Sequence, residues 1–192
     1  AEYRSWRQGQ ILRSKQFSST LDQVSQAMVN ANQVAMAALA GKLPEVYAEN
    51  ANCSAFWVCK ETGLAVGFDL VDADTVQHML TAGEAALMLP SVNVAKDMAW
   101  NRKLVASQLT QGVLLGESIP KMARRVQRVT GSNYATAVRT ARTTVTGAEN
   151  AGRVHSYQRA KEMGIKLQKE WLATLEGRKR HSHRQLDGQK IT

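Results

Sequence analysis

The chain has 192 residues, 44% of them hydrophobic, and only three prolines, so a disordered chain is excluded and one domain or two small subdomains are expected. The net charge is +9, from 25 Lys/Arg and 16 Asp/Glu. There is no run of about 18 apolar residues, and the opening sequence AEYRSWRQGQILRSKQF is polar, so we expect neither a membrane span nor a signal peptide.

The positive charge is concentrated in the second half of the chain. Residues 1–95 hold 6 Lys/Arg and 9 Asp/Glu, a net charge of −3, whereas residues 96–192 hold 19 and 7, a net charge of +12. Clustered cations gain free energy by releasing counterions from phosphates, so this half is the candidate contact with a polyanion. A solvated basic face is the alternative. Cys53 and Cys59 fit no zinc-ligand spacing, and we expect buried or inert free thiols, with a disulfide or a redox role as the alternatives.

The first half of the chain predicts a series of helices. Residues 1–18 form a basic arm that we expect either to become ordered on binding a partner or to pack on the body. Apolar residues recur at helical spacing over 19–42, and a second helix is expected over 44–61. An extended segment then leads to a helix capped by Asp72 or Asp74, and the segment from Gly83 to Pro90 closes that unit.

Residues 92–164 predict three further helices. The first covers about 92–112, and a short basic amphipathic helix follows, with Pro120 in its first turn and Gly131 at its end. A long central helix then begins at Ser132. Gly147 and Gly152 within it each cost about 1 kcal/mol relative to Ala unless another backbone approaches closely, which predicts a helix contact there.

Beyond Gly164 the apolar residues no longer recur at helical spacing but at every second position, which predicts a strand. One face of that strand consists of Trp171, Ala173 and Leu175. Glu176-Gly177 and Asp187-Gly188 are turn signals, and residues 189–192 form a second extended piece. The expected fold is mainly α: a helical body with one long central helix and a small C-terminal β element (α+β).

Three tracts, in order, carry a resemblance to a known family. They read QGVLLGESIPKMARRV, ARTTVTGAENAGR and KEWLATLEGRKRHSHRQLDGQ. Together they resemble the phage head morphogenesis family, the minor head proteins similar to the Mu F protein. The chain departs from the family pattern at two positions. Thr144 stands where an acidic residue is common, and Glu176 stands where Asp is common. The resemblance divides the chain into an arm (1–18), a helical region (19–112) and a head morphogenesis region (113–192) that looks truncated at its C-terminal end.

The resemblance implies a structural minor head protein with no catalytic residues, metal or cofactor. It implies a place in the virion, inside the head at the portal vertex, after assembly in the host cytoplasm. The implied partners are the portal protein, scaffold or major capsid protein, and double-stranded viral DNA held through its phosphates, with no membrane. The matching structural positions are Arg142, Glu149, Arg153, Trp171, Arg180, His183, Asp187 and Gly188.

A basic patch is the candidate surface for DNA or portal binding. Its members are Lys121, Arg124, Arg125, Arg128, Arg178, Lys179, Arg180 and Arg184. No aromatic residues are interleaved to stack on bases, so any DNA contact should be to the backbone and independent of sequence. A solvated or internally paired face is the alternative for these residues.

Three other hypotheses compete with the structural one. His181 and His183 could bind a metal with His155 or Asp187 as a third ligand, although the surrounding cations disfavour a dication. A DNA-processing or toxin-like enzyme, either a nuclease or an ADP-ribosyl transferase, could use Arg142, Glu149, Arg180 and His183, with Glu149 as general base. A free-standing, non-specific DNA-binding protein is the third interpretation.

Overall fold

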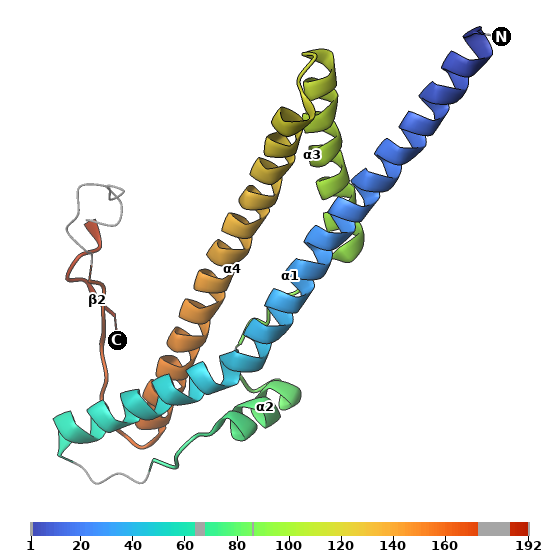
Figure 1. Ribbon diagram of the computed structural model, residues 1–192. Coiled ribbons are helices and arrows are strands. Elements are labelled where there is room, and N and C mark those ends of the chain that lie inside the picture. Colours follow the sequence, from blue (N-terminus) through green and yellow to red (C-terminus); the bar gives the residue numbers. More distant parts are fainter. Residues whose placement is uncertain (1, 64–67, 86, 173–184, 192) are drawn as a thin grey trace. The chain divides into compact units, whose positions relative to one another are not determined.

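The computed structural model describes residues 2–63, 68–85, 87–172 and 185–191. Its helices are α1 (Glu2–Thr62), α2 (Ala73–Ala82), α3 (Val94–Leu114) and α4 (Ile119–Glu162), and its strands are β1 (Lys169–Glu170) and β2 (Lys190–Ile191) (Figure 1). The fold is mainly α, with long helices and a small C-terminal β element, as predicted. None of the helices in the described part combines the length and the apolar run that a membrane span needs.

The residues group into two compact units, each built from parts of α1 and α4. Unit 1 comprises Ala1–Pro44 and Leu87–Ala148, and unit 2 comprises Glu45–Ala86 and Glu149–Thr192. In unit 1, α1, α3 and α4 enclose a core of buried apolar side chains. These are Leu21, Met28, Val105 and Val129, with Val24, Ala106, Leu109 and Val126 partly buried beside them.

The two helices predicted over 19–42 and 44–61 are one helix, α1, so the expected break was wrong. Pro44 lies inside α1 and is buried. An interior proline costs about 3 kcal/mol through its missing N–H and its ring. Burial offsets that cost here, because the neighbouring Leu43 is fully buried and Tyr47 is 2% exposed.

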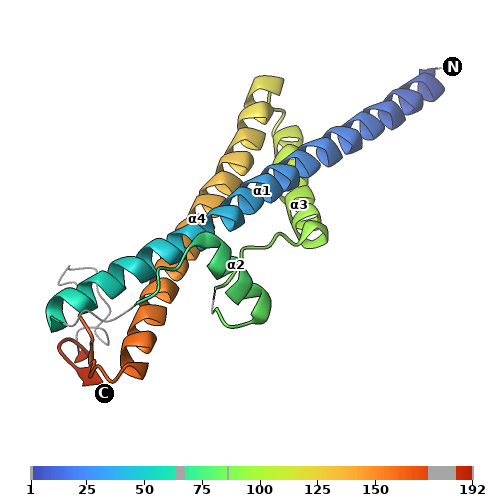
Figure 2. The ribbon, with the colours of Figure 1, turned by 90° about the horizontal axis from the view of Figure 1, so that it is seen from below.

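Residues 2–18 belong to α1 as well. This segment extends past α3 and α4 in both views (Figures 1 and 2), and its large apolar side chains are exposed, Trp6 by 61% and Leu12 by 61%. That a partner binds this segment stays a prediction.

Unit 2 is organised around α2, whose predicted ends are confirmed. Asp72 is the N-cap, and its carboxylate accepts a 2.7 Å hydrogen bond from the backbone N–H of Thr75. A hydrogen bond from the Thr75 side chain, followed by this backbone bond, lowers the pKa of the Asp72 carboxyl. Gly83 ends the helix with φ of 75°, in the left-handed region that glycine adopts without a steric cost. The core of the unit is Tyr47, Ala48 and Val76, with Val71, Leu80, Ala85 and Ala151 packed against it.

α4 joins the two helices that were predicted on either side of Gly131, so that boundary was also wrong. Gly131 lies within α4, and an added β-carbon there would meet nothing within 4 Å. A helical glycine costs about 1 kcal/mol. The inward stripe of buried Val129 and half-buried Asn133 continues across it, which holds the helix together.

The β element is an antiparallel pair with Lys169 opposite Ile191 and Glu170 opposite Lys190. The backbone of Trp171 extends the pairing, since its N–H donates to the Gln189 carbonyl at 3.0 Å. The strand therefore begins two residues before Trp171. The Asp187-Gly188 turn is confirmed, with φ of 74° at Gly188. The predicted positions 173, 175 and 176–177 lie outside the described residues.

Candidate interaction surface

The surface of α4 in unit 1 carries cations and no acids. From residue 118 to residue 148 the sequence has six Lys/Arg and no Asp or Glu. Five of those side chains are exposed, namely Lys121, Arg124, Arg128, Arg139 and Arg142. The first three are members of the predicted patch. Arg139 and Arg142 extend the positive surface toward the middle of α4.

Arg125 is the exception in the predicted patch, because its guanidinium is held within unit 1. Its Nε and one terminal nitrogen donate to the two carboxylate oxygens of Glu117 at 2.7 and 2.8 Å. Its other terminal nitrogen reaches the side-chain oxygens of Gln108 and Gln111, both at 3.3 Å. The hydrogen bond from Arg125 lowers the pKa of the Glu117 carboxyl. Arg125 therefore ties the turn between α3 and α4 together.

The remaining members of the patch, Arg178, Lys179, Arg180 and Arg184, lie outside the described residues, as do His181 and His183. The hypotheses on these positions stay predictions. Within the described part of the chain, no group of three or more His, Cys, Asp or Glu side chains is arranged to hold a metal ion.

In unit 2, α4 lies against α1 through a glycine contact that the sequence predicted. A β-carbon on Gly152 would overlap the carbonyl oxygen of Tyr47 and lie 3.1 Å from the backbone nitrogen of Ala51. One turn later, the Ser156 hydroxyl donates to the Ala51 carbonyl at 2.6 Å. Gly147 behaves differently, since a β-carbon there meets nothing within 4 Å, so the contact predicted for it was wrong.

Two polar side chains of α4, Arg153 and His155, make contacts within unit 2. Arg153 donates through Nε to the Asn50 side-chain oxygen at 3.2 Å. His155 lies against the Tyr47 ring, with the ring centroids 5.9 Å apart. Burial, followed by the nearby Arg159 charge, lowers the pKa of His155. Glu149 is partly exposed and does not line the groove described next.

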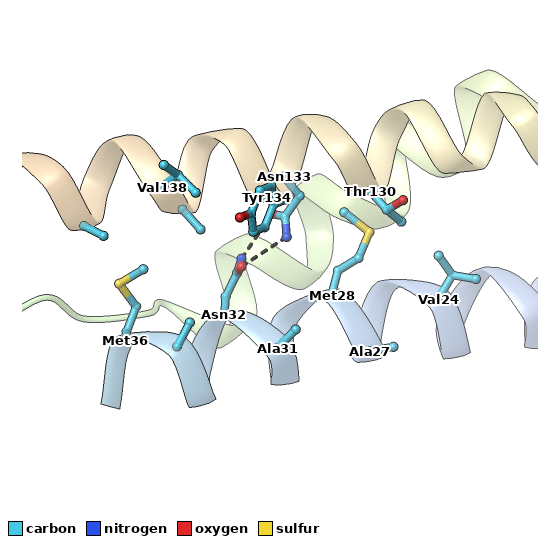
Figure 3. Close-up of a pocket in the computed structure, with 13 residues that line it drawn as sticks. Val24, Ala27, Met28, Ala31, Asn32, Met36, Thr130, Asn133, Tyr134 and Val138 are labelled. Atoms are coloured by element: carbon cyan, nitrogen blue, oxygen red, sulfur yellow. Dashed lines mark hydrogen bonds between the residues drawn. The ribbon is translucent and has the colours of Figure 1, made fainter. Parts of the chain in front are cut away.

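An open apolar groove of about 500 Å³ runs between α1 and α4 in unit 1 (Figure 3). Asn32 and Asn133 bridge it through two reciprocal amide hydrogen bonds, each 3.1 Å long. The other lining residues are Val24, Ala27, Met28, Ala31, Ala35, Met36, Thr130, Tyr134, Ala137, Val138 and Ala141. We refer to these thirteen residues as the α1–α4 groove.

The groove was not predicted from the sequence; Ala31 and Ala35 of α1 and Tyr134 of α4 line it. All three are exposed, Tyr134 by 72%. The available signal was the spacing of Ala27, Ala31 and Ala35, four residues apart on α1. Small side chains at that spacing leave room for another helix to approach.

Comparison with known proteins adds three findings. Residues 103–192 match the family described as Phage Mu protein F like protein. The chain is 33% identical over 145 residues to minor head protein GP7 of Bacillus phage SPP1, covering 76% of this chain and 46% of that protein. It is 28% identical over 130 residues to NAD(+)--arginine ADP-ribosyltransferase EFV of Enterococcus faecalis, covering 67% of this chain and 26% of that protein. No solved structure matches.

Proposed function

The chain belongs to the phage minor head protein family through its Mu F-like region, residues 103–192, and on that premise we propose that it is a structural head protein that binds the portal and lies near packaged DNA. In this proposal it resides in the virion, at the inner side of the portal vertex, and acts in head assembly and in DNA packaging or ejection. The chain spans less than half the length of the relatives it matches, 46% and 26%.

The observation that carries this proposal is the carboxylate-free surface of α4. Five exposed cations on residues 118–148, with no acid among them, make a strongly positive face. Such a face suits the phosphate backbone of DNA or an acidic surface of the portal protein, and it selects for charge and not for base sequence. The exposed N-terminal turns of α1 offer a second, apolar contact for the portal, with Trp6 61% exposed.

Co-purification with assembled portal rings of the same phage tests the proposal. We expect the full chain to remain with the rings through size exclusion, and a chain lacking residues 2–18 to bind more weakly if α1 supplies the apolar contact. A chain that separates completely from the rings contradicts portal binding.

DNA contact is tested separately by measuring duplex affinity against salt concentration. Each phosphate contact contributes about 0.9 to the slope of log K against log salt. Replacing Lys121, Arg124 and Arg128 by Gln should reduce the slope by up to about 2.7 and weaken binding equally for all sequences. Binding without salt dependence removes DNA from the proposal.

The similarity to an ADP-ribosyltransferase supports an enzymatic role as a second candidate function. That candidate would use Arg142 and Glu149 of α4 together with Arg180 and His183. Hydrolysis of NAD⁺ by the chain, abolished in Glu149→Ala and retained in Glu162→Ala, would establish it. Our proposal of a non-enzymatic role predicts no turnover in either variant or in the unaltered chain.

A further inference from the structure

The walls of the α1–α4 groove hold no carboxylate over long stretches of sequence. On α1, residues 23–44 contain one Lys and no Asp or Glu, and on α4, residues 118–148 contain six Lys/Arg and no Asp or Glu. Ala31, Ala35 and Tyr134 leave the apolar floor open to solvent. A helix that fits this groove therefore needs apolar or aromatic side chains along its contact stripe and carboxylates beside them.

A surface with those properties lies on α1 in unit 2. Glu49, Cys53, Phe56, Trp57, Lys60 and Glu61 are all exposed and recur at helical spacing on one side of the helix. Phe56 is 58% exposed and Trp57 50% exposed, and their rings meet edge to face with centroids 5.5 Å apart. Lys60 lies over the Trp57 ring, 4.5 Å from its centroid. We refer to these six residues as the acidic aromatic face, which carries two Glu and one Lys, a net charge of −1.

The charge of this segment is opposite to that of the groove. Residues 45–62 contain three Glu and one Lys, a net charge of −2. The other helical segments of the described chain with exposed aromatic side chains are cationic. Residues 2–18 carry four Lys/Arg and one acid, α3 carries three and one, and residues 149–162 carry three and two. Those segments would place positive charge against positive groove walls, which costs binding energy.

We propose that the α1–α4 groove of one copy of this chain binds the acidic aromatic face of a second copy. Phe56 and Trp57 enter the apolar floor beside the small side chains of Ala31 and Ala35, and Glu49 faces the cations of α4. Large aromatic anchors in a groove lined by small residues supply most of the affinity in helix-in-groove contacts. The contact goes beyond portal binding and does not depend on it.

The two surfaces are different patches, so the contact is heterologous. Each copy keeps one unused groove and one unused acidic aromatic face after the first contact forms. Association therefore continues from dimer to higher species, and the series either closes into a ring or remains an open chain.

Sedimentation equilibrium of the 192-residue chain over a concentration series, at low and at high salt, tests the proposal. We expect concentration-dependent association that weakens as salt screens the charges. Ala31→Glu places a carboxylate in the groove, whereas Ala99→Glu changes the net charge equally at an exposed position of α3 away from it. Ala31→Glu and Phe56→Ala should each raise the dissociation constant about tenfold or more, and Ala99→Glu should leave it unchanged.

Cys53 lets the contact be mapped directly, because it lies on the acidic aromatic face and is exposed. One chain carries Cys59→Ser and so keeps Cys53. It is mixed with a second chain that carries Cys53→Ser, Cys59→Ser and, in the groove, Tyr134→Cys. Mild oxidation should join the two into a disulfide-linked pair of twice the mass. The matched chain with Cys at position 99 in place of position 134 should give no such pair.

Two results overturn the proposal. One is a chain that stays monomeric throughout the concentration series, which would leave the groove to an acidic helix of another protein. The other is association that persists unchanged in Ala31→Glu and in Phe56→Ala, which would place the contact elsewhere. Loss of portal binding with self-association intact would refute only the proposed function.

Discussion

The Gly152 contact gives the sharpest test of how unit 2 is held together, through the substitution Gly152→Ala. In a helix without neighbours this change stabilises by about 1 kcal/mol, because glycine loses more backbone entropy than alanine on folding. Here the new β-carbon overlaps the Tyr47 carbonyl oxygen and lies 3.1 Å from the Ala51 nitrogen. Both obstructing atoms belong to the backbone, so no side chain can rotate away.

The helices must separate to admit the methyl group. Overpacking of this kind costs about 1–3 kcal/mol, and the upper part of that range applies where the backbone itself has to move. Separation also stretches the 2.6 Å hydrogen bond from Ser156 to the Ala51 carbonyl, which contributes about 1 kcal/mol. After the propensity gain is subtracted, we expect a net destabilisation of about 2 kcal/mol.

Gly147→Ala is the matched control on the same helix. A β-carbon at Gly147 meets nothing within 4 Å, so this variant should be stabilised by about 1 kcal/mol. Urea unfolding followed by far-UV circular dichroism should then separate the two midpoints by about 1 M or more. Equal midpoints for the two variants would refute the close contact between α1 and α4 at Gly152.

Three further predictions concern charged and titratable side chains. Arg125→Ala should lower the urea midpoint, because it leaves Glu117 without its two hydrogen bonds. Arg128→Ala is the control at an exposed position and should leave the midpoint unchanged. Equal midpoints for the two variants would contradict the internal role of Arg125. The pKa of His155 is lowered in the folded chain, so stability is complete above its ordinary value of 6.5 and falls as the pH drops from there toward the folded-state pKa. His155→Gln should flatten that slope in urea titrations, and an unchanged slope would assign it to another group. Arg128→Gln should weaken duplex DNA binding without changing stability, and unaltered affinity by fluorescence anisotropy would remove Arg128 from the DNA-binding surface.

The sequence predicted the elements whose signals are local. Asp72 and Gly83 mark the ends of α2 because a cap and a left-handed glycine act within one turn of the helix. The Asp187-Gly188 turn was found for the same reason. The Gly152 contact was also predictable, since a costly glycine inside a long helix indicates a close neighbour.

Features that depend on tertiary packing were not predictable in this way. Pro44 and Gly131 look like helix ends, yet burial of residues such as Leu43 and Val129 holds α1 and α4 continuous through them. Arg125 is one more cation in the sequence, and only the fold brings Glu117 to it. The α1–α4 groove combines residues about a hundred positions apart, such as Asn32 and Asn133, so the alanine spacing on α1 could indicate one wall of it but not the other.

The affinity of the chain for portal rings tests the central claim most directly. The measurement compares the unaltered chain with a variant in which Lys121, Arg124 and Arg128 are replaced by Gln. All three side chains are exposed, so the variant should fold as the unaltered chain does. If the carboxylate-free face of α4 binds an acidic portal surface, the variant should lose at least about tenfold in affinity, and the difference should shrink as salt increases. Equal affinities at every salt concentration would contradict the claim.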